Sequence, residues 1–244
     1  MEKESEITQA PENGALEEKK REKVVPGEIV ETGTTFLPGE NTKRIGENII
    51  ATRYGLLDKE GRLVKVIPLS GIYLPRRGNV VIGKIEDITF NGWLIDIDAP
   101  YKAFLPITEC QGFIRKGEDL SAIFAIGDMV IVMVTSVKAK GVDLTMRENG
   151  LYKIESGLTM KINSSKVPRV IGKQGSMINL IKESTNCNIV VGQNGVVWIR
   201  GEDIDQELLA KETINLITEK SYIEGLTDYI KEFLDTKKSK KGGF

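Results

Sequence analysis

The chain has 244 residues, which is enough for two or three small domains, each with a modest core of its own. Hydrophobic residues make up 40% of it and charged residues 28%, as in ordinary globular proteins, and no apolar run approaches the roughly 20 residues that span a membrane. The formal net charge of −1 argues against a protein that coats nucleic acid through its overall charge. Any nucleic-acid binding must therefore come from a local surface.

Catalytic and metal-binding residue types are scarce in this sequence. It contains no histidine, which is the usual general base near neutral pH and the commonest metal ligand. Cys110 and Cys187 lie far apart and lack C-x-x-C spacing, so neither a zinc site nor a disulfide framework is predicted. Asp96 and Asp98 alternate with apolar residues at the strand period, which favours a solvated strand face. We expect no catalytic residue, no metal and no cofactor.

The N-terminal third of the chain predicts a tail followed by a small β domain. Residues 1–23 mix both charge signs without an apolar core, so they predict a disordered cytoplasmic tail and no targeting peptide. From 24 to 77, short β-rich runs alternate with turn residues, which is typical of a small β domain. The segment Pro75-Arg76-Arg77-Gly78 is the expected domain junction.

The middle segment, residues 78–149, predicts a second β domain. Five β-rich runs follow one another, and residues 118–124 between the third and fourth runs allow only a short helical turn. Five strands around one small helix match the five-stranded Greek-key barrel of the OB fold.

The periodicity changes after residue 150. Residues 158–163 predict a strand, 165–170 a helical turn, and 176–185 a helix with an apolar stripe. Asn194-Gly195 is a strong hairpin signal, and 203–234 predicts helix with an interruption near Gly225. Residues 150–236 thus predict an α+β domain with C-terminal helices, and 237–244 a basic flexible tail. The fold class is multidomain, β plus α+β.

The most specific motif is a G-x-x-G loop placed between two predicted helices, and together with this element order it resembles the type I KH domain. Two glycines let the backbone approach phosphates, and the following helix start offers free N–H groups. A KH loop clamps about four nucleotides of single-stranded RNA. The resemblance implies RNA binding by Ile171, Gly172, Lys173, Gln174 and Gly175. The alternative is a tight helix-to-helix turn within a packing module.

The middle domain resembles the RNA-binding OB domain named after ribosomal protein S-one. The matching segments are Gly83-Lys84-Ile85, Asn91-Gly92-Trp93-Leu94-Ile95, Ala103-Phe104-Leu105-Pro106 and Gly127-Asp128-Met129-Val130. That family carries aromatic or histidine side chains where this chain has Asn91, Leu94 and Pro106, so the usual stacking platform is largely missing.

Other RNA contacts on the middle domain are therefore expected from basic side chains. The pattern favours Trp93 and Phe104 as core or interface residues. The remaining candidates for RNA binding are Arg115, Lys116, Lys138 and Lys140. The alternative for the lysines is that they keep a hairpin soluble.

The order of tail, β domain, S-one type barrel and single KH domain resembles the RNA-binding cap subunit of the archaeal exosome, of the Rrp-four type. Pro26-Gly27-Glu28 and Leu144-Thr145-Met146-Arg147 add local matches. The resemblance implies a non-catalytic cytoplasmic protein, three copies of which sit on a phosphorolytic exoribonuclease ring of RNase-PH-like subunits. The N-terminal domain would dock on this ring, the barrels would surround its entrance pore, and the KH domains would capture single-stranded RNA. No membrane is implied.

Three alternative classes of protein fit the sequence less well. The other archaeal cap subunit carries a zinc ribbon, which two lone cysteines cannot supply. A transcription elongation factor of the NusA type also places an S-one barrel before KH, but it has two KH modules of a different element order, and one G-x-x-G occurs here. Such a factor, or another RNA-binding adaptor, remains the runner-up among binding proteins. A nuclease in its own right is disfavoured because the chain has no histidine and no spaced cluster of acids.

Overall fold

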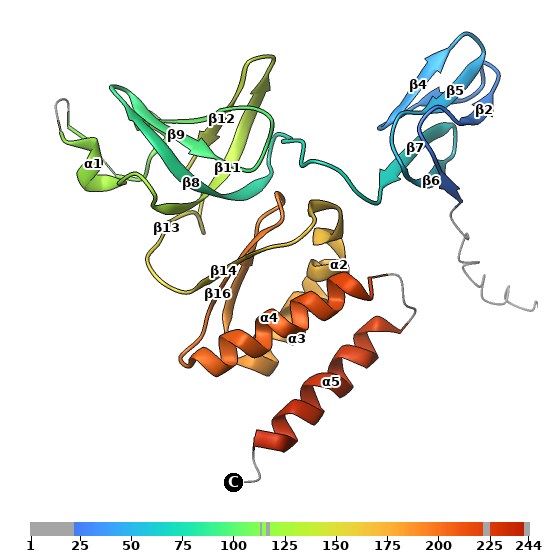
Figure 1. The fold of residues 1–244 in the computed structure, drawn as a ribbon. Coiled ribbons are helices and arrows are strands. Elements are labelled where there is room, and N and C mark those ends of the chain that lie inside the picture. The colour runs from blue at the N-terminus through green and yellow to red at the C-terminus, as the bar shows by residue number, and fades with distance from the viewer. Residues whose placement is uncertain (1–21, 113, 116–117, 222–224, 242–244) are drawn as a thin grey trace, which may run out of the picture. The chain divides into compact units, whose positions relative to one another are not determined.

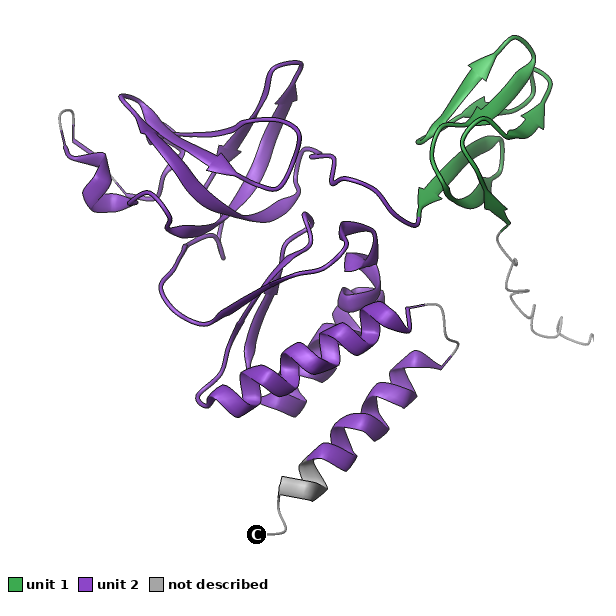
Figure 2. Cartoon of the chain, viewed as in Figure 1, with its two compact units in different colours: residues 1–68 green, residues 69–244 purple. Residues whose placement is uncertain are grey.

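In a computed structural model, the chain forms two compact units, residues 1–68 and 69–244 (Figure 2). The structure describes residues 22–112, 114–115, 118–221 and 225–241, with the backbone alone for 238–241. The expected tail at 1–23 therefore lies almost wholly outside the described residues. In the described part of the chain, no helix is long and apolar enough to cross a membrane.

The first unit is built from short strands, which pair in antiparallel except for β3, which pairs with β7 in parallel. One sheet has the order β1-β6-β7-β3 and the other the order β2-β5-β4. Val24, Ala51, Leu57, Val64 and Val66 are buried together as its core. The strands are β1 (Lys23–Val24), β2 (Ile29–Thr32), β3 (Leu37–Pro38), β4 (Thr42–Ile45), β5 (Asn48–Ala51), β6 (Gly55–Glu60) and β7 (Leu63–Pro68).

The second unit begins with a closed barrel. Its five main strands run in the order β12-β10-β9-β8-β11, and the barrel closes because β12 pairs with β10 in parallel and with β11 in antiparallel (Figure 1). This is the OB-type barrel expected from the sequence. Its elements are β8 (Val80–Thr89), β9 (Gly92–Asp96), β10 (Ala103–Pro106), the 3-10 turn η1 (Ile107–Glu109), α1 (Leu120–Ile123), β11 (Met129–Lys138), β12 (Gly141–Thr145) and the short β13 (Lys153–Ile154).

The barrel core also takes in part of the preceding linker. Trp93 is fully buried, and its indole ring meets Phe124 edge-on at 5.0 Å between ring centroids. Tyr73 is buried in the same cluster and donates a hydrogen bond to Asn79 Oδ1 at 2.9 Å, and burial raises the pKa of its phenol well above the usual range. The first unit ends at Pro68, whereas the sequence places the domain junction near Arg77.

The KH part of the second unit follows. Its three-stranded sheet has the order β14-β16-β15, and α2, α3 and α4 pack together with one another (Figure 1). The helix predicted at 176–185 is present, as is the hairpin at Asn194-Gly195. The elements are β14 (Leu158–Lys161), η2 (Ser164–Lys166), α2 (Val167–Ile171), η3 (Lys173–Gly175), α3 (Ser176–Thr185), β15 (Asn188–Val191), β16 (Val196–Arg200), α4 (Ile204–Glu219) and α5 (Leu226–Lys241).

The C-terminal helices follow from the apolar periodicity of the sequence. Ile214, Ile217, Ile230 and Leu234 are buried in the KH core, and the break predicted near Gly225 separates α4 from α5. Helix α5 runs to Lys241, so it includes most of the segment 237–244 that the sequence predicts to be a flexible basic tail.

Candidate RNA-binding surface

The G-x-x-G loop turns the chain between α2 and α3. Gly172 has φ 75° and ψ 176°, a region that glycine alone adopts readily. A Cβ on Gly172 would lie 2.7 Å from the Met177 backbone nitrogen, so there is no room for a side chain. Gly175 also has a positive φ, of 82°, but a Cβ there would meet nothing nearer than 3.7 Å. Gly172 is therefore required by both conformation and space, and Gly175 by conformation alone.

The loop presents two side chains to solvent and leads into an uncapped helix. Lys173 and Gln174 are exposed, and Gln174 itself is left-handed, with φ 53°. Gly175 precedes the first residue of α3, and no side chain caps this N-terminus. The first N–H groups of a helix, together with the positive end of its dipole, attract an anion. The loop thus combines the exposed ammonium of Lys173 with a helix start suited to a phosphate.

Apolar and basic side chains surround the loop. Ile171 is half-buried against the KH core, as is Leu180 on α3. Arg169, in the last turn of α2, is exposed and lies four residues before Lys173. Arg169 lies outside the G-x-x-G motif, so the sequence did not single it out, and the non-helical backbone of Gly172 separates it from Lys173.

The basic candidates on the barrel do not gather in one place. Arg115 is exposed on the segment after η1, where its backbone N–H donates to Glu118 Oε2 at 2.9 Å. Lys138 and Lys140 lie at the β11–β12 turn, next to Lys102, whose carbonyl accepts from Val142 N at 2.9 Å. Lys102 immediately precedes β10, whereas Arg115 comes after β10 and η1, so the two groups of basic residues lie toward opposite ends of this strand. Lys116 lies outside the described residues.

The charge of Lys138 is already compensated. Its ammonium lies 2.5 Å from Asp143 Oδ2, which also accepts from Ser136 Oγ at 2.6 Å. The hydrogen bond from Lys138 lowers the pKa of the Asp143 carboxyl most, and the hydrogen bond from Ser136 lowers it further. Lys140 is exposed, and no ion pair of its side chain is found among the described residues. Lys140 and Lys102 are thus better placed than Lys138 to meet a phosphate.

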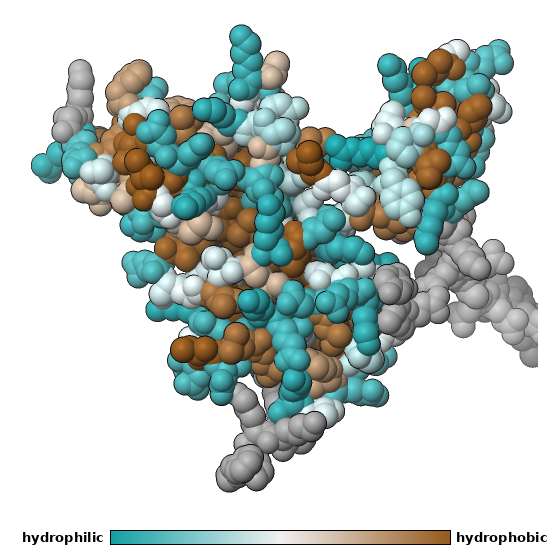
Figure 3. All heavy atoms as spheres, in the orientation of Figure 1, coloured by the Kyte–Doolittle hydropathy of each residue, from teal (hydrophilic) through white to brown (hydrophobic). Residues whose placement is uncertain are grey.

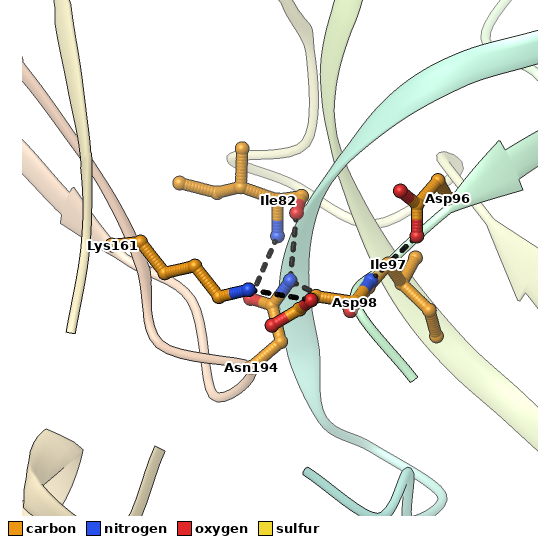
Figure 4. Close-up of polar contacts among 6 residues, drawn as sticks. All are labelled: Ile82, Asp96, Ile97, Asp98, Lys161 and Asn194. Carbon is orange, nitrogen blue, oxygen red and sulfur yellow. Dashed lines mark hydrogen bonds and ion pairs between the residues drawn. The ribbon is translucent and has the colours of Figure 1, made fainter. Parts of the chain in front are cut away.

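The β15–β16 turn joins the KH part to the barrel. Asn194 is buried, and its Nδ2 donates to Ile82 O at 2.8 Å and to Ile97 O at 3.0 Å, while Ile82 N donates to its Oδ1 at 3.4 Å (Figure 4). Gln193 N also donates to Val80 O at 2.8 Å. The side chain of Asn194 thereby satisfies backbone groups of two barrel strand ends, as a neighbouring strand would.

An ion pair accompanies this contact. Lys161 on β14 lies 2.6 Å from Asp98 Oδ1, and Asp98 N donates to Asp96 Oδ1 at 2.9 Å (Figure 4). Asp96 and Asp98 are exposed, as predicted, and within the described ranges no group of three or more acidic, cysteine or histidine side chains is gathered for a metal. We call the contacts of Asn194, Gln193 and Lys161 the barrel–KH seam.

A barrel of the OB type joined to a KH domain defines a class of RNA-binding protein, and comparison with known proteins agrees with it. The KH domain family model matches residues 157–216. The chain is 41% identical to "Exosome complex component Rrp4" of Methanothermus fervidus, over 88% of this chain and 96% of that protein. It is 38% identical to the protein of the same name from Nitrosopumilus maritimus, over 89% and 97% of the two chains. The chain belongs to the Rrp4 family of exosome complex components.

A solved structure agrees with this assignment. A crystal structure described as an exosome complex RNA-binding protein has a TM-score of 0.63 and 32% identity, and it covers 70% of this chain and 99% of its own. The resemblance expected from the domain order is thus confirmed.

Proposed function

We propose that this chain is a non-catalytic cap subunit of the exosome that captures single-stranded RNA and guides it into a phosphorolytic ring. Membership of the Rrp4 family supports association with the exosome, and the G-x-x-G loop supports RNA capture. The observation that carries the proposal is the loop itself, in which Lys173 is exposed beside the uncapped start of α3. As part of the same proposal, three copies sit on one ring of RNase-PH-like subunits and act in the cytoplasm.

The loop binds RNA through its backbone and one charge. A phosphate can approach Gly172 and Gly175 closely because neither carries a side chain, and the α3 dipole favours the negative charge. Little base readout is needed for this contact, so binding tolerates many sequences. Such tolerance suits a subunit that feeds a nonspecific exonuclease.

The first unit is the proposed docking module. It has its own core and ends at Pro68, and Tyr73 beyond it belongs to the barrel core. Removal of residues up to Pro68 should therefore leave the barrel and KH parts folded.

Co-purification tests this proposal. The full chain should co-elute with a ring of phosphorolytic subunits, whereas a fragment that begins at Leu69 should bind RNA but not the ring. A full chain that never associates with the ring would contradict the exosome assignment. A fragment that still co-elutes would mean that docking surfaces lie outside the first unit.

A further inference from the structure

A pocket on the KH sheet belongs neither to the G-x-x-G loop nor to the seam. It lies at the ends of β15 and β16 that are far from their turn, where Asn188 pairs with Arg200. Its volume is ≈ 450 Å³, within the range of roughly 300 to 1,000 Å³ that is usual for small ligands. The lining residues are Tyr152, Asn186, Asn188, Trp198, Arg200, Gly201 and Glu202.

The pocket opens on the face of the sheet that the helices do not cover. Val197 and Ile199 are buried in the KH core, so Trp198 and Arg200, which alternate with them along β16, point to the opposite face. The loop lies at the other end of α3, because it precedes this helix whereas Asn186 follows it. Ten helical residues span about 15 Å, so a phosphate held at the loop does not reach the pocket.

Two aromatic rings form an apolar corner of this pocket. Trp198 is buried, and its Nε1 donates to Ser156 O at 2.8 Å, which satisfies its one polar group. Tyr152 is half-buried, and its ring stands at 75° to the indole with the centroids 5.9 Å apart. Burial raises the pKa of Tyr152, and a hydrogen bond from Asn188 opposes this in part, so the phenol is neutral near pH 7. A flat ligand ring can therefore lie against Tyr152 without meeting a charge.

One cation and one anion stand beside the aromatic corner. Arg200 is exposed, and no salt bridge of its guanidinium occurs within the part of the chain that the structure describes. A guanidinium binds a phosphate through paired hydrogen bonds. Glu202 is also exposed, and carboxylates accept hydrogen bonds from ribose hydroxyls in nucleotide sites. Glu207 is used by the backbone, since it accepts from Gly201 N at 3.0 Å, and Asp203 does not line the pocket.

We propose that this pocket binds a nucleotide, with the base against Tyr152, a ribose hydroxyl at Glu202 and the phosphate at Arg200. A base stacks on an aromatic side chain whatever its sequence, because every base has a flat face. A free nucleotide and a nucleotide within an RNA strand offer the same groups, so the test must separate these two sources. The site shares no residue with the loop, so it does not rest on the RNA capture proposed above.

The test titrates the full chain with uridine monophosphate, with uridine and with an oligouridine. Tyr152→Leu keeps an apolar side chain on Trp198 but removes the stacking ring, so it should weaken uridine monophosphate binding roughly five- to hundredfold. Arg200→Ala should weaken uridine monophosphate about tenfold or more and leave uridine unchanged, because only the phosphate is lost as a partner.

Matched variants control for nonspecific effects. Tyr54→Leu removes a tyrosine that is 41% exposed in the first unit, and it should bind all three ligands normally. Lys173→Ala should weaken the oligouridine at the loop but leave uridine monophosphate unchanged. Because Arg200 is exposed, its substitution should keep the fold, and this variant decides the test if thermal unfolding shows that Tyr152→Leu is misfolded.

The results distinguish the two sources and the two proposals. Weaker binding of uridine monophosphate in both pocket variants supports a site for free nucleotides, and weaker binding of the oligouridine alone supports a site for a nucleotide of the strand. Unchanged binding of both ligands in both variants, or an equal loss of uridine and its monophosphate in Arg200→Ala, would overturn the proposal. A wild type that binds uridine monophosphate in the pocket but no oligouridine would remove the proposed RNA capture and leave this site standing.

Discussion

At the scale of single residues, the phosphate binding that we propose at the loop depends on Lys173. It is exposed beside an uncapped helix start, so its charge is available to a ligand. We predict that Lys173→Ala reduces the slope of log affinity against log salt by about 0.7, the effect of one phosphate contact on a single strand. Titrations at several salt concentrations measure this. An unchanged slope and affinity would make the KH part a packing module.

The two glycines of the loop should differ in their tolerance of alanine. In Gly172→Ala the Cβ meets the Met177 backbone in a glycine-only conformation, which should cost about 3 kcal/mol or more of unfolding free energy. In Gly175→Ala the cost should be about 1 kcal/mol, for the positive φ alone. Urea unfolding of the two variants gives the comparison. Equal losses would show that the packing against Met177 does not restrict this position.

At the scale of elements, the β15–β16 hairpin belongs to the KH sheet and also forms hydrogen bonds with the barrel through its turn. Its turn inserts Asn194 against β8 and the residue after β9, so a KH element completes the hydrogen bonding of the barrel. Most of the binding strength of the seam should come from these buried bonds, because the Lys161–Asp98 pair is solvent-exposed.

A pair of substitutions tests this division. Asn194→Ala leaves two buried carbonyls and one amide of the barrel without a partner, and we predict a loss of about 2 to 4 kcal/mol in unfolding free energy. Lys161→Ala should cost less than about 1 kcal/mol. Thermal or urea unfolding measures both. A larger loss of unfolding free energy in Lys161→Ala than in Asn194→Ala would show that the ion pair stabilises the seam more than the buried hydrogen bonds do.

Local patterns predicted most of the elements but not the seam. The apolar stripe at 176–185 specifies a helix, and Asn194-Gly195 specifies a turn, because each signal depends on neighbouring residues. The burial of Asn194 depends on Ile82, which is 112 positions away in the chain, and no local pattern reports such a distance. A turn-forming asparagine and one that bonds another domain have the same sequence signature.

The candidate site, like the elements, was predictable from the sequence only where its residues are neighbours in the chain. The loop residues are adjacent in sequence, so their grouping followed from the motif. The separation of Arg115 from Lys138 and Lys140 depends on the closure of the barrel by the parallel pairing of β10 and β12. The pairing of Lys138 with Asp143 likewise depends on cross-strand register.

At the scale of the whole molecule, the chain consists of two units. The first unit is a small β domain, for which we propose a docking role, and the second holds the barrel and KH parts together through the seam (Figure 2). On the face shown in Figure 3, hydrophobic side chains lie in small groups among hydrophilic ones. RNA capture by such a surface relies on a few local contacts, which agrees with the net charge of −1.

The most direct test of the central claim measures RNA phosphorolysis by the ring with and without this chain. The chain alone, with magnesium and phosphate, should release no nucleotides, and the ring should degrade RNA faster when the chain is bound. A chain with Lys173→Asp and Gln174→Asp should assemble normally but stimulate much less, because both exposed positions then repel phosphate. Lys231→Asp, on the exposed face of α5, serves as the charge control. Nucleotide release by the chain alone, or full stimulation by the loop variant, would contradict the account.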